Sequence, residues 1–172
     1  GQAIVRSESG EEMLTTDNII LSCGSSSASF PGLAPDGDAV LDSTGVLNLP
    51  EVPESLIIVG AGAIGLELGD FFGMMGSKIT IVEAAPHIAP TEDADIAKEM
   101  DRVQSKAGRT CITGVMAKSL VTKDGQAELT LGDGRVLTAS KALVAVGRTP
   151  NTAGLDCEKA GCTLKRLSLI HI

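Results

Sequence analysis

The sequence predicts an α/β fold with a parallel sheet, and three observations carry that prediction. Residues 55–59 contain a continuous aliphatic run, Leu56 to Val59, which is typical of a strand buried on both faces of a parallel sheet. Glycines follow at positions 60, 62 and 65, and from Ala63 onward the apolar residues recur with a helical period. Residues 78–83 then predict a second strand. A strand, helix and strand in under 30 residues is typical of a right-handed crossover.

Length and composition narrow the class of protein. The 172 residues, of which 43% are hydrophobic, suffice for one domain, or for one domain with fragments of a neighbour, and exclude wholesale disorder. With 14 basic and 22 acidic residues the formal net charge is −8, which disfavours nucleic acid as a partner. The longest apolar run, residues 56–66, falls short of the roughly 20 residues that span a bilayer. We therefore expect neither nucleic acid nor a membrane as a partner.

Four cysteines, at positions 23, 111, 157 and 162, lack the paired spacing of a zinc site. We expect Cys23 and Cys111 to be small buried hydrophobic residues and the thiols to be reduced, as in a cytoplasmic protein. Neither His87 nor His171 has metal-ligand spacing, so we expect no metal and assign neither as a general base. Because the chain begins at Gly1 without Met, we expect its N-terminus to be a cut within a longer protein.

The first 50 residues have a mixed pattern. Residues 3–7 and 11–16 predict a hairpin around Ser9 and Gly10, and residues 18–22 predict a buried strand. Residues 24–42 are rich in Ser, Gly, Pro and Asp without periodicity, which indicates a loop or a crossing between domains.

Two helices and a β-meander are predicted beyond residue 60. The first helix ends near Gly76, with one apolar side formed by Ile64, Leu68, Phe71, Phe72 and Met75. The second covers residues 93–107 and has a stripe of Ile96, Met100, Val103 and Ala107. Residues 109–146 predict a β-meander with turns at Gly125 and at 133–134, followed by a buried strand at 142–146.

The glycine turn predicts a Rossmann-like dinucleotide site. Gly60, Ala61, Gly62, Ala63, Ile64 and Gly65 fit the pattern G-x-G-x-x-G between a buried strand and a helix. Gly60 permits the tight turn, Gly62 lets the backbone approach a pyrophosphate, and Gly65 lets the helix pack against the strand. Free amides at the helix N-terminus then bind the phosphates without a cationic side chain.

Glu83, at the end of the second strand, favours NAD over NADP. A carboxylate accepts hydrogen bonds from a ribose diol and repels a 2′-phosphate. Two simpler explanations stay open. The glycine turn is a coincidence in another kind of α/β protein, or Glu83 is a solvated acid at the end of a strand.

Several further segments, together with this motif, resemble the flavin- and NAD(P)-dependent pyridine nucleotide-disulfide oxidoreductases, and most closely the dihydrolipoyl dehydrogenases among them. The resemblance covers about residues 12–164, and its pieces are residues 16–25, Phe30-Pro31-Gly32, residues 60–69, residues 82–84, residues 93–98 and residues 146–151.

This resemblance implies a Rossmann-like NAD-binding domain inserted in a FAD-binding domain. Residues 1–50 would be the end of the FAD-binding domain, 51–141 the NAD-binding domain, and 142–165 the return to the FAD-binding domain. It also implies that Glu67 and Gly147 lie at the NAD site, while Cys23, Gly24, Ser25 and Arg148 lie by the flavin. The cofactors would be NAD and FAD, and the complete protein would be a homodimer.

The sequence also departs from the family pattern. The family usually has Ala-Thr-Gly where residues 22–24 read Ser-Cys-Gly, and residues 166–172 no longer follow it. The first flavin glycine motif, the redox cysteine pair and the catalytic His and Glu are not found. Cys157 and Cys162 have the spacing of that redox pair, but they fall where the resemblance implies an ordinary surface segment. We therefore assign no catalytic residue.

Two classes of function follow. The chain is the NAD-binding part of an FAD-dependent, dihydrolipoyl dehydrogenase-like enzyme, or of a relative such as mercuric or glutathione reductase, in which electrons pass from a dithiol through flavin to NAD. By itself this chain would be inactive. Alternatively, it is a non-catalytic NAD-binding fragment or, less favoured, part of a flavin-free Rossmann dehydrogenase.

Overall fold

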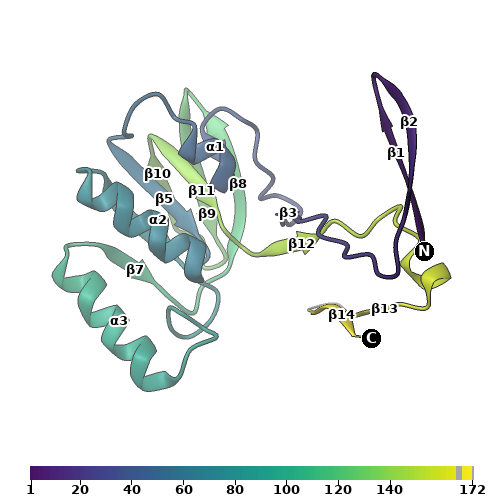
Figure 1. The fold of residues 1–172 in the computed structure, drawn as a ribbon. Coiled ribbons are helices and arrows are strands. Elements are labelled where there is room, and N and C mark those ends of the chain that lie inside the picture. The colour runs from purple at the N-terminus through teal and green to yellow at the C-terminus, as the bar shows by residue number, and fades with distance from the viewer. Residues whose placement is uncertain (166–167, 172) are drawn as a thin grey trace. The chain divides into compact units, whose positions relative to one another are not determined.

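The computed structural model describes residues 1–165 and 168–171, which form two compact units. The central unit consists of Ser26–Thr149, and the terminal unit combines Gly1–Ser25 with the described residues from Pro150 onward (Figure 1). The domain boundaries proposed at residues 50, 141 and 165 rest on the family resemblance and stay predictions.

A five-stranded parallel sheet forms the framework of the central unit, as the aliphatic runs predict. Its strand order is β4-β11-β5-β6-β7, and every neighbouring pair is parallel. The strands are β4 (Val40–Leu41), β5 (Ser55–Val59), β6 (Lys78–Val82), β7 (Thr110–Ile112) and β11 (Lys141–Val144). Leu56 to Val59 are all buried, because both faces of this sheet are covered.

Three α-helices belong to the central unit: α1 (Ser43–Leu47), α2 (Ala63–Met74) and α3 (Ala94–Lys106). Helix α1 is capped by the Asp42 carboxylate, which accepts a hydrogen bond of 2.8 Å from Gly45 N. Helix α2 ends before Gly76, whose φ of +105° is the left-handed conformation that glycine supplies at a helix C-terminus. The predicted extents of α2 and α3 are confirmed to within one or two residues.

The predicted apolar side of α2 is wrong in detail. The buried residues of this helix are Gly65, Leu66, Gly69 and Phe72, whereas Phe71 is 47% exposed and Met75 is 56% exposed. The glycines explain the error, because they bring the helix close to the sheet while contributing nothing to an apolar pattern. A Cβ atom on Gly69 would lie 3.0 Å from Ile58 Cδ1.

The stripe predicted for α3 is wrong in the same way. Ala97 and Gln104 are buried, while Ile96 and Val103 are about half exposed. Gln104 is buried because its side chain accepts a hydrogen bond of 2.8 Å from Arg109 Nη1. The Arg109 guanidinium also forms an ion pair with Asp70 on α2 at 2.6 Å. Polar bonding, rather than apolar periodicity, thus determines part of the buried face of this helix.

An antiparallel meander covers the other face of the sheet. It consists of β8 (Ala117–Lys123), β9 (Gln126–Leu131) and β10 (Val136–Ala139), in the order β10-β9-β8. Leu120, Leu129 and Leu131 join Ile57 and Val144 in one core cluster. The predicted meander is therefore confirmed, except that β7, within the same predicted range, pairs with β6 in the parallel sheet.

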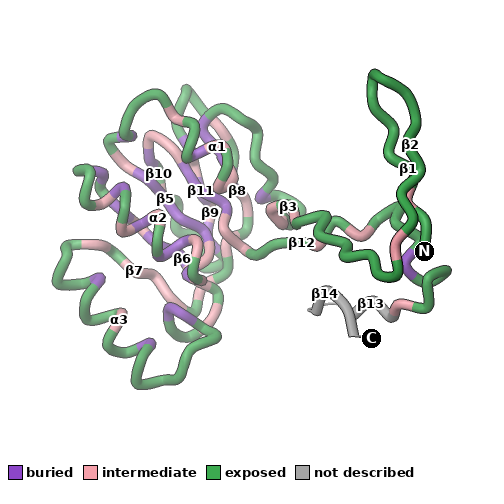
Figure 2. Tube along the Cα trace, in the orientation of Figure 1, coloured by how far each residue is buried: buried purple, intermediate pink, exposed green. Residues whose placement is uncertain are grey.

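The terminal unit is built from short elements. A hairpin pairs β1 (Gln2–Ser7) with β2 (Gly10–Thr15), as predicted, and a 3₁₀ helix, η1 (Cys157–Ala160), precedes β13 (Thr163–Lys165) and β14 (Ser168–His171). Strands β3 (Ser25–Ser27) and β12 (Arg148–Pro150) pair where the chain passes between the units. Figure 2 shows buried residues along β5, β9 and β11, whereas the hairpin is exposed.

The predicted buried strand at residues 18–22 is wrong. The structure assigns no strand there, and Ile20 is 89% exposed. An aliphatic run needs a partner strand before it can form a ladder, and none of the described residues pairs with this run.

Of the tail at residues 166–172, residues 166, 167 and 172 lie outside the described part. Within that part, no helix is long and apolar enough to cross a bilayer.

Candidate functional site

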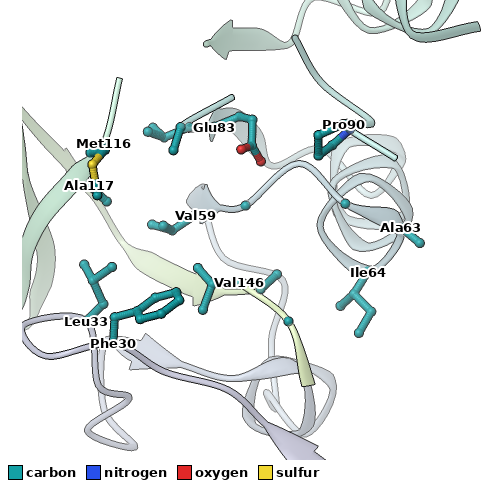
Figure 3. Close-up of a pocket in the computed structure, with 16 residues that line it drawn as sticks. Phe30, Leu33, Val59, Ala63, Ile64, Glu83, Pro90, Met116, Ala117 and Val146 are labelled. Carbon is teal, nitrogen blue, oxygen red and sulfur yellow. The ribbon is translucent and has the colours of Figure 1, made fainter. Parts of the chain in front are cut away.

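A cavity of about 460 Å³ lies in the central unit where strands β5, β6 and β11 end (Figure 3). Strand β5 leads through α2 to β6 on one side, and β11 flanks β5 on its other side. The connections therefore run in opposite directions at this point, and α/β sheets bind ligands at such a switch point, beyond the carboxyl ends of the strands.

Gly60 makes the turn out of β5 and has a φ of +104°. A Cβ atom there would lie 2.4 Å from the Ala145 carbonyl oxygen, so a side chain fits neither the backbone conformation nor the space. The Gly60 amide donates to the Val82 carbonyl at 2.8 Å. The first glycine of the motif thus joins the ends of β5, β6 and β11.

Gly65 and Gly62 differ in their surroundings. A Cβ atom on Gly65 would lie 2.0 Å from the Gly60 carbonyl oxygen, because the first turn of α2 packs directly on the loop. Gly62 lines the cavity, and a Cβ atom there would meet nothing within 4 Å. The space beside Gly62 is therefore open to a ligand that a side chain would obstruct.

The N-terminus of α2 faces this space with its amides. Gly62 is the N-cap and has no side-chain capping bond, and Gly62, Ala63 and Ile64 line the cavity. The first amides of a helix have no acceptor within the helix, and the helix dipole favours negative charge there. The arrangement suits a phosphate group.

Glu83 follows β6 directly, and its side chain points toward the glycine turn (Figure 3). Its Oε2 atom accepts a hydrogen bond of 2.7 Å from Ala61 N, and its Oε1 atom accepts one of 2.8 Å from Ala85 N. A carboxylate oxygen has two lone pairs, so each oxygen keeps one acceptor position. Two acceptors at the rim of the cavity match a vicinal diol.

The remaining walls of the cavity are mostly apolar and were not predicted as site residues. Phe30, Leu33, Val59, Val146, Met116 and Pro90 lie around it (Figure 3). Phe30 and Val146 had a sequence signal, as parts of the Phe30-Pro31-Gly32 turn and of the segment 146–151, and Val59 belongs to the predicted strand at 55–59. Met116 had none: it lies just before β8, where its carbonyl accepts a hydrogen bond of 2.8 Å from Gly132 N.

Of the remaining site residues, Glu67 and Gly147 were assigned to NAD and Arg148 to the flavin, and they lie in different places. Gly147 lines the cavity at the end of β11, whereas Glu67 is an exposed residue of α2 and is not part of the cavity wall. Arg148 is an exposed residue at the start of β12. The structure thus brings Gly60, Gly62, Ala63, Ile64, Glu83 and Gly147 together.

A second cavity, of about 350 Å³, lies in the terminal unit. Cys23, Gly24, Ser25, Asn151 and Cys157 are among the residues that line it. The Asn151 side-chain amide donates to the Cys23 carbonyl at 3.1 Å, and the Asn151 backbone amide donates to the Gly24 carbonyl at 3.0 Å. Three of the residues assigned to the flavin therefore line one cavity.

The cysteines are all free thiols and differ in burial. Cys23 is exposed, so the expectation that it is buried is wrong: it lies in an extended segment without strand partners. Cys111 is half-buried, and burial raises the pKa of its thiol, with the Asp101 charge adding to the effect. Cys157 is buried at the start of η1, and its carbonyl accepts a hydrogen bond of 3.0 Å from Cys162 N.

The ring of His87 is bonded locally, because its Nδ1 atom lies 2.9 Å from the Ile88 carbonyl.

Comparison with known proteins agrees with this geometry. The family model for pyridine nucleotide-disulphide oxidoreductases matches residues 1–172. Dihydrolipoyl dehydrogenase 3 of Pseudomonas putida is 35% identical over 167 residues, which cover 94% of this chain and 36% of that protein. Leghemoglobin reductase of Vigna unguiculata is 36% identical over 170 residues, which cover 96% of this chain and 32% of that protein. The chain thus spans about a third of the length of these relatives.

Solved structures give the same result. LpdA from Mycobacterium tuberculosis superimposes with a TM-score of 0.83 at 30% identity, covering 95% of this chain and 36% of that protein. The HOCl-induced flavoprotein disulfide reductase RclA from Escherichia coli superimposes with a TM-score of 0.81 at 30% identity, covering 98% of this chain and 39% of that protein. The chain belongs to the pyridine nucleotide-disulphide oxidoreductase family.

Proposed function

We propose that this chain is the NAD-binding part of an FAD-dependent oxidoreductase similar to dihydrolipoyl dehydrogenase. The observation that carries the proposal is the placement of the Glu83 carboxylate on the same cavity as the first-turn amides of α2. One group suits a ribose diol and the other suits a pyrophosphate, and a dinucleotide contains both.

The chemistry of the cavity sets the direction of the dinucleotide. The adenosine ribose would bind at Glu83, with Met116 and Pro90 as apolar surfaces for the adenine. The pyrophosphate would bind at Gly62, Ala63 and Ile64. The nicotinamide would then extend toward Gly147, at the end of β11. This chain's residues would bind and orient the hydride acceptor, and the apolar walls would exclude water from it.

Charge favours NAD over NADP. Among the described residues that line the cavity, Glu83 is the only charged one and none is Lys or Arg. A 2′-phosphate would therefore meet a carboxylate without a cation to compensate it.

The flavin would contact the second cavity, at Cys23, Gly24 and Ser25, where a short polar segment with a left-handed glycine brings the backbone within reach of a ligand. Bound FAD would supply two-electron chemistry: a dithiol would give up two electrons and two protons to become a disulfide, and NAD⁺ would accept both electrons with one proton as a hydride, the other proton going to solvent. The roles of Glu67 and Arg148 and the homodimer of the complete protein rest on the family resemblance alone, and the cytoplasmic location rests on the expectation of reduced thiols.

The direct test is a titration of the purified chain with NADH and NADPH. We expect tighter binding of NADH, and we expect Glu83→Ala to narrow that preference by about tenfold, because the substitution removes both the diol acceptor and the repulsion of the 2′-phosphate. Glu92→Ala removes an exposed acid from the neighbouring loop and serves as the control. An unchanged NADH to NADPH ratio in Glu83→Ala would remove Glu83 from this role.

A second candidate is a nucleotide-binding chain without redox activity. It is favoured by the lack of an assigned dithiol: Cys157 and Cys162 lie at the two ends of one short turn around η1, where the Cys162 amide donates to the Cys157 carbonyl. A colourless chain that binds NADH would support this candidate. Retained flavin with dithiol-dependent reduction of NAD⁺ would exclude it.

A further inference from the structure

Glu83 is bonded through both carboxylate oxygens to the backbone of two different loops. One bond, of 2.7 Å, comes from Ala61 in the glycine turn after β5. The other, of 2.8 Å, comes from Ala85 in the segment after β6. A residue that served only as a ligand for ribose would need neither bond.

Ala61 is the residue of the glycine turn that depends on Glu83. It is fully buried, its amide donates to Glu83, and its carbonyl accepts a hydrogen bond of 2.9 Å from Ala89 N. A buried amide that loses its acceptor destabilises the conformation that holds it. The Glu83 carboxylate therefore stabilises this conformation of the turn, together with the bond from Gly60 to Val82.

The backbone on either side of the carboxylate is fixed independently of the glycine turn. The Glu83 amide donates to the Ile112 carbonyl at 2.8 Å, and the Gly114 amide donates to the Ala85 carbonyl at 2.8 Å. These bonds attach residues 83–85 to the end of β7. The backbone that carries the carboxylate is thus held by bonds that do not involve the glycine turn.

We propose that Glu83 is a positioning residue for the pyrophosphate as well as a ligand for the adenosine ribose. By holding Ala61, it fixes the adjoining amides of Gly62, Ala63 and Ile64 in the phosphate-binding orientation before a dinucleotide arrives. One side chain can both hold Ala61 and bind the ribose. Each carboxylate oxygen accepts a hydrogen bond from a backbone amide with one lone pair and has the other available for a ribose hydroxyl. The inference rests on the proposed binding of a dinucleotide in this cavity.

The experiment separates the two roles with a nucleotide that cannot use the ribose role. The complete 172-residue chain and its Glu83→Gln variant are titrated with NADH and with an NADH analogue whose adenosine ribose lacks the 2′ and 3′ hydroxyls. Glutamine keeps the length of the side chain but replaces one acceptor oxygen by an NH₂ donor, which cannot accept from a backbone amide. Glu92→Gln, which makes the same charge change at an exposed site, is the control.

We expect Glu83→Gln to bind the dideoxy analogue about fivefold more weakly than the unsubstituted chain does. We also expect its melting temperature without nucleotide to fall by about 4 °C, while Glu92→Gln changes neither quantity. Equal affinity for the analogue together with an equal melting temperature would overturn the proposal and leave Glu83 with the ribose role alone.

Two further readouts keep the inference distinct from the proposed function. If the unsubstituted chain bound neither nucleotide, the proposed function would fail, and an unchanged melting temperature in Glu83→Gln would then overturn the hold on the turn as well. If Glu83→Gln did not fold, hydrogen exchange on the unsubstituted chain would decide: slow exchange of the Ala61 amide without nucleotide supports the proposal, and fast exchange overturns it.

Discussion

The central unit buries its aliphatic residues, whereas the terminal unit exposes them. In the central unit, Ile57, Ile58 and Ile81 are at most 2% exposed, between the helices on one face of the sheet and the meander on the other. In the terminal unit, Ile4, Met13 and Ile20 are more than half exposed, and Cys157 is the one buried residue among residues 1–25 and 150–162. The difference teaches that hydrophobic sequence builds a core only where two layers of structure face each other.

The consequence is a difference in where the energy of folding arises. Burial of apolar surface stabilises the central unit, whereas the hairpin of the terminal unit depends on backbone bonds and on exposed pairs such as Arg6 with Glu11. A two-stranded hairpin by itself is marginally stable in water. The cavity beside the glycine turn lies wholly within the central unit, which has its own hydrophobic core.

The largest expected effect is on the free energy of unfolding, and it comes from comparing one substitution in each unit. Ile58→Ala should lower the free energy of unfolding by about 3 kcal/mol, because Ile58 is fully buried against α2. Ile20→Ala should change it by less than about 0.5 kcal/mol, because its side chain is 89% exposed. Denaturant unfolding followed by circular dichroism measures both. Similar losses from the two substitutions would show that the terminal unit buries Ile20 in solution.

An effect of intermediate size is expected in the rates at which a thiol reagent modifies one cysteine of each unit. Iodoacetamide should label Cys23 of the terminal unit at least about tenfold faster than Cys111 of the central unit. Cys23 is exposed, whereas burial raises the pKa of the half-buried Cys111 thiol and lowers its thiolate fraction. Mass spectrometry of tryptic peptides over a time course gives both rates. Faster labelling of Cys111 would contradict the assigned burial.

The smallest expected effect concerns Asp36 of the central unit. Its carboxylate accepts hydrogen bonds from the amides of Asp38 and Val40, at 2.9 and 3.0 Å, and from the Thr122 hydroxyl. Partial burial acts to raise the pKa of Asp36, but these hydrogen bonds together outweigh it and hold the pKa below its usual value. Asp36→Asn should therefore cost about 0.5 kcal/mol at neutral pH, a small value because the group is exposed.

The sign of the pH dependence follows from that lowered pKa. A carboxylate whose pKa is lower in the folded state contributes stability above its unfolded pKa, and loses that contribution as the pH falls through the folded value. Melting temperatures of Asp36→Asn and the unsubstituted chain should thus differ at pH 7 and converge below about pH 3. Asp17→Asn, in the exposed segment of the terminal unit, is the control. A difference that grows on acidification would exclude this account.

The parallel sheet and the position of the turn could be predicted because they depend on local sequence. A run such as residues 55–59 has few ways to satisfy its apolar side chains, and a glycine at position 60 is required by a backbone conformation that other residues avoid. Glu83 could be placed at the site for the same reason, since it directly follows a predictable strand.

The faces of the helices and the fate of the strand at residues 18–22 could not be predicted. Gly65 and Gly69 set the buried face of α2 because they allow a close approach to the sheet, which is a property of two elements together. Met116 lies just before β8, where its carbonyl accepts a hydrogen bond from Gly132 N, and no residue near it in the sequence signals that it lines the cavity.

The sequence by itself thus determined the α/β class, the glycine turn and the acid that follows the next strand, because each depends on backbone conformation and local periodicity. The tertiary structure alone decided which residues surround the cavity and that Glu83 accepts hydrogen bonds from Ala61 and Ala85. The Ala61 contact joins residues 22 positions apart along the chain, and only packing brings these two residues together.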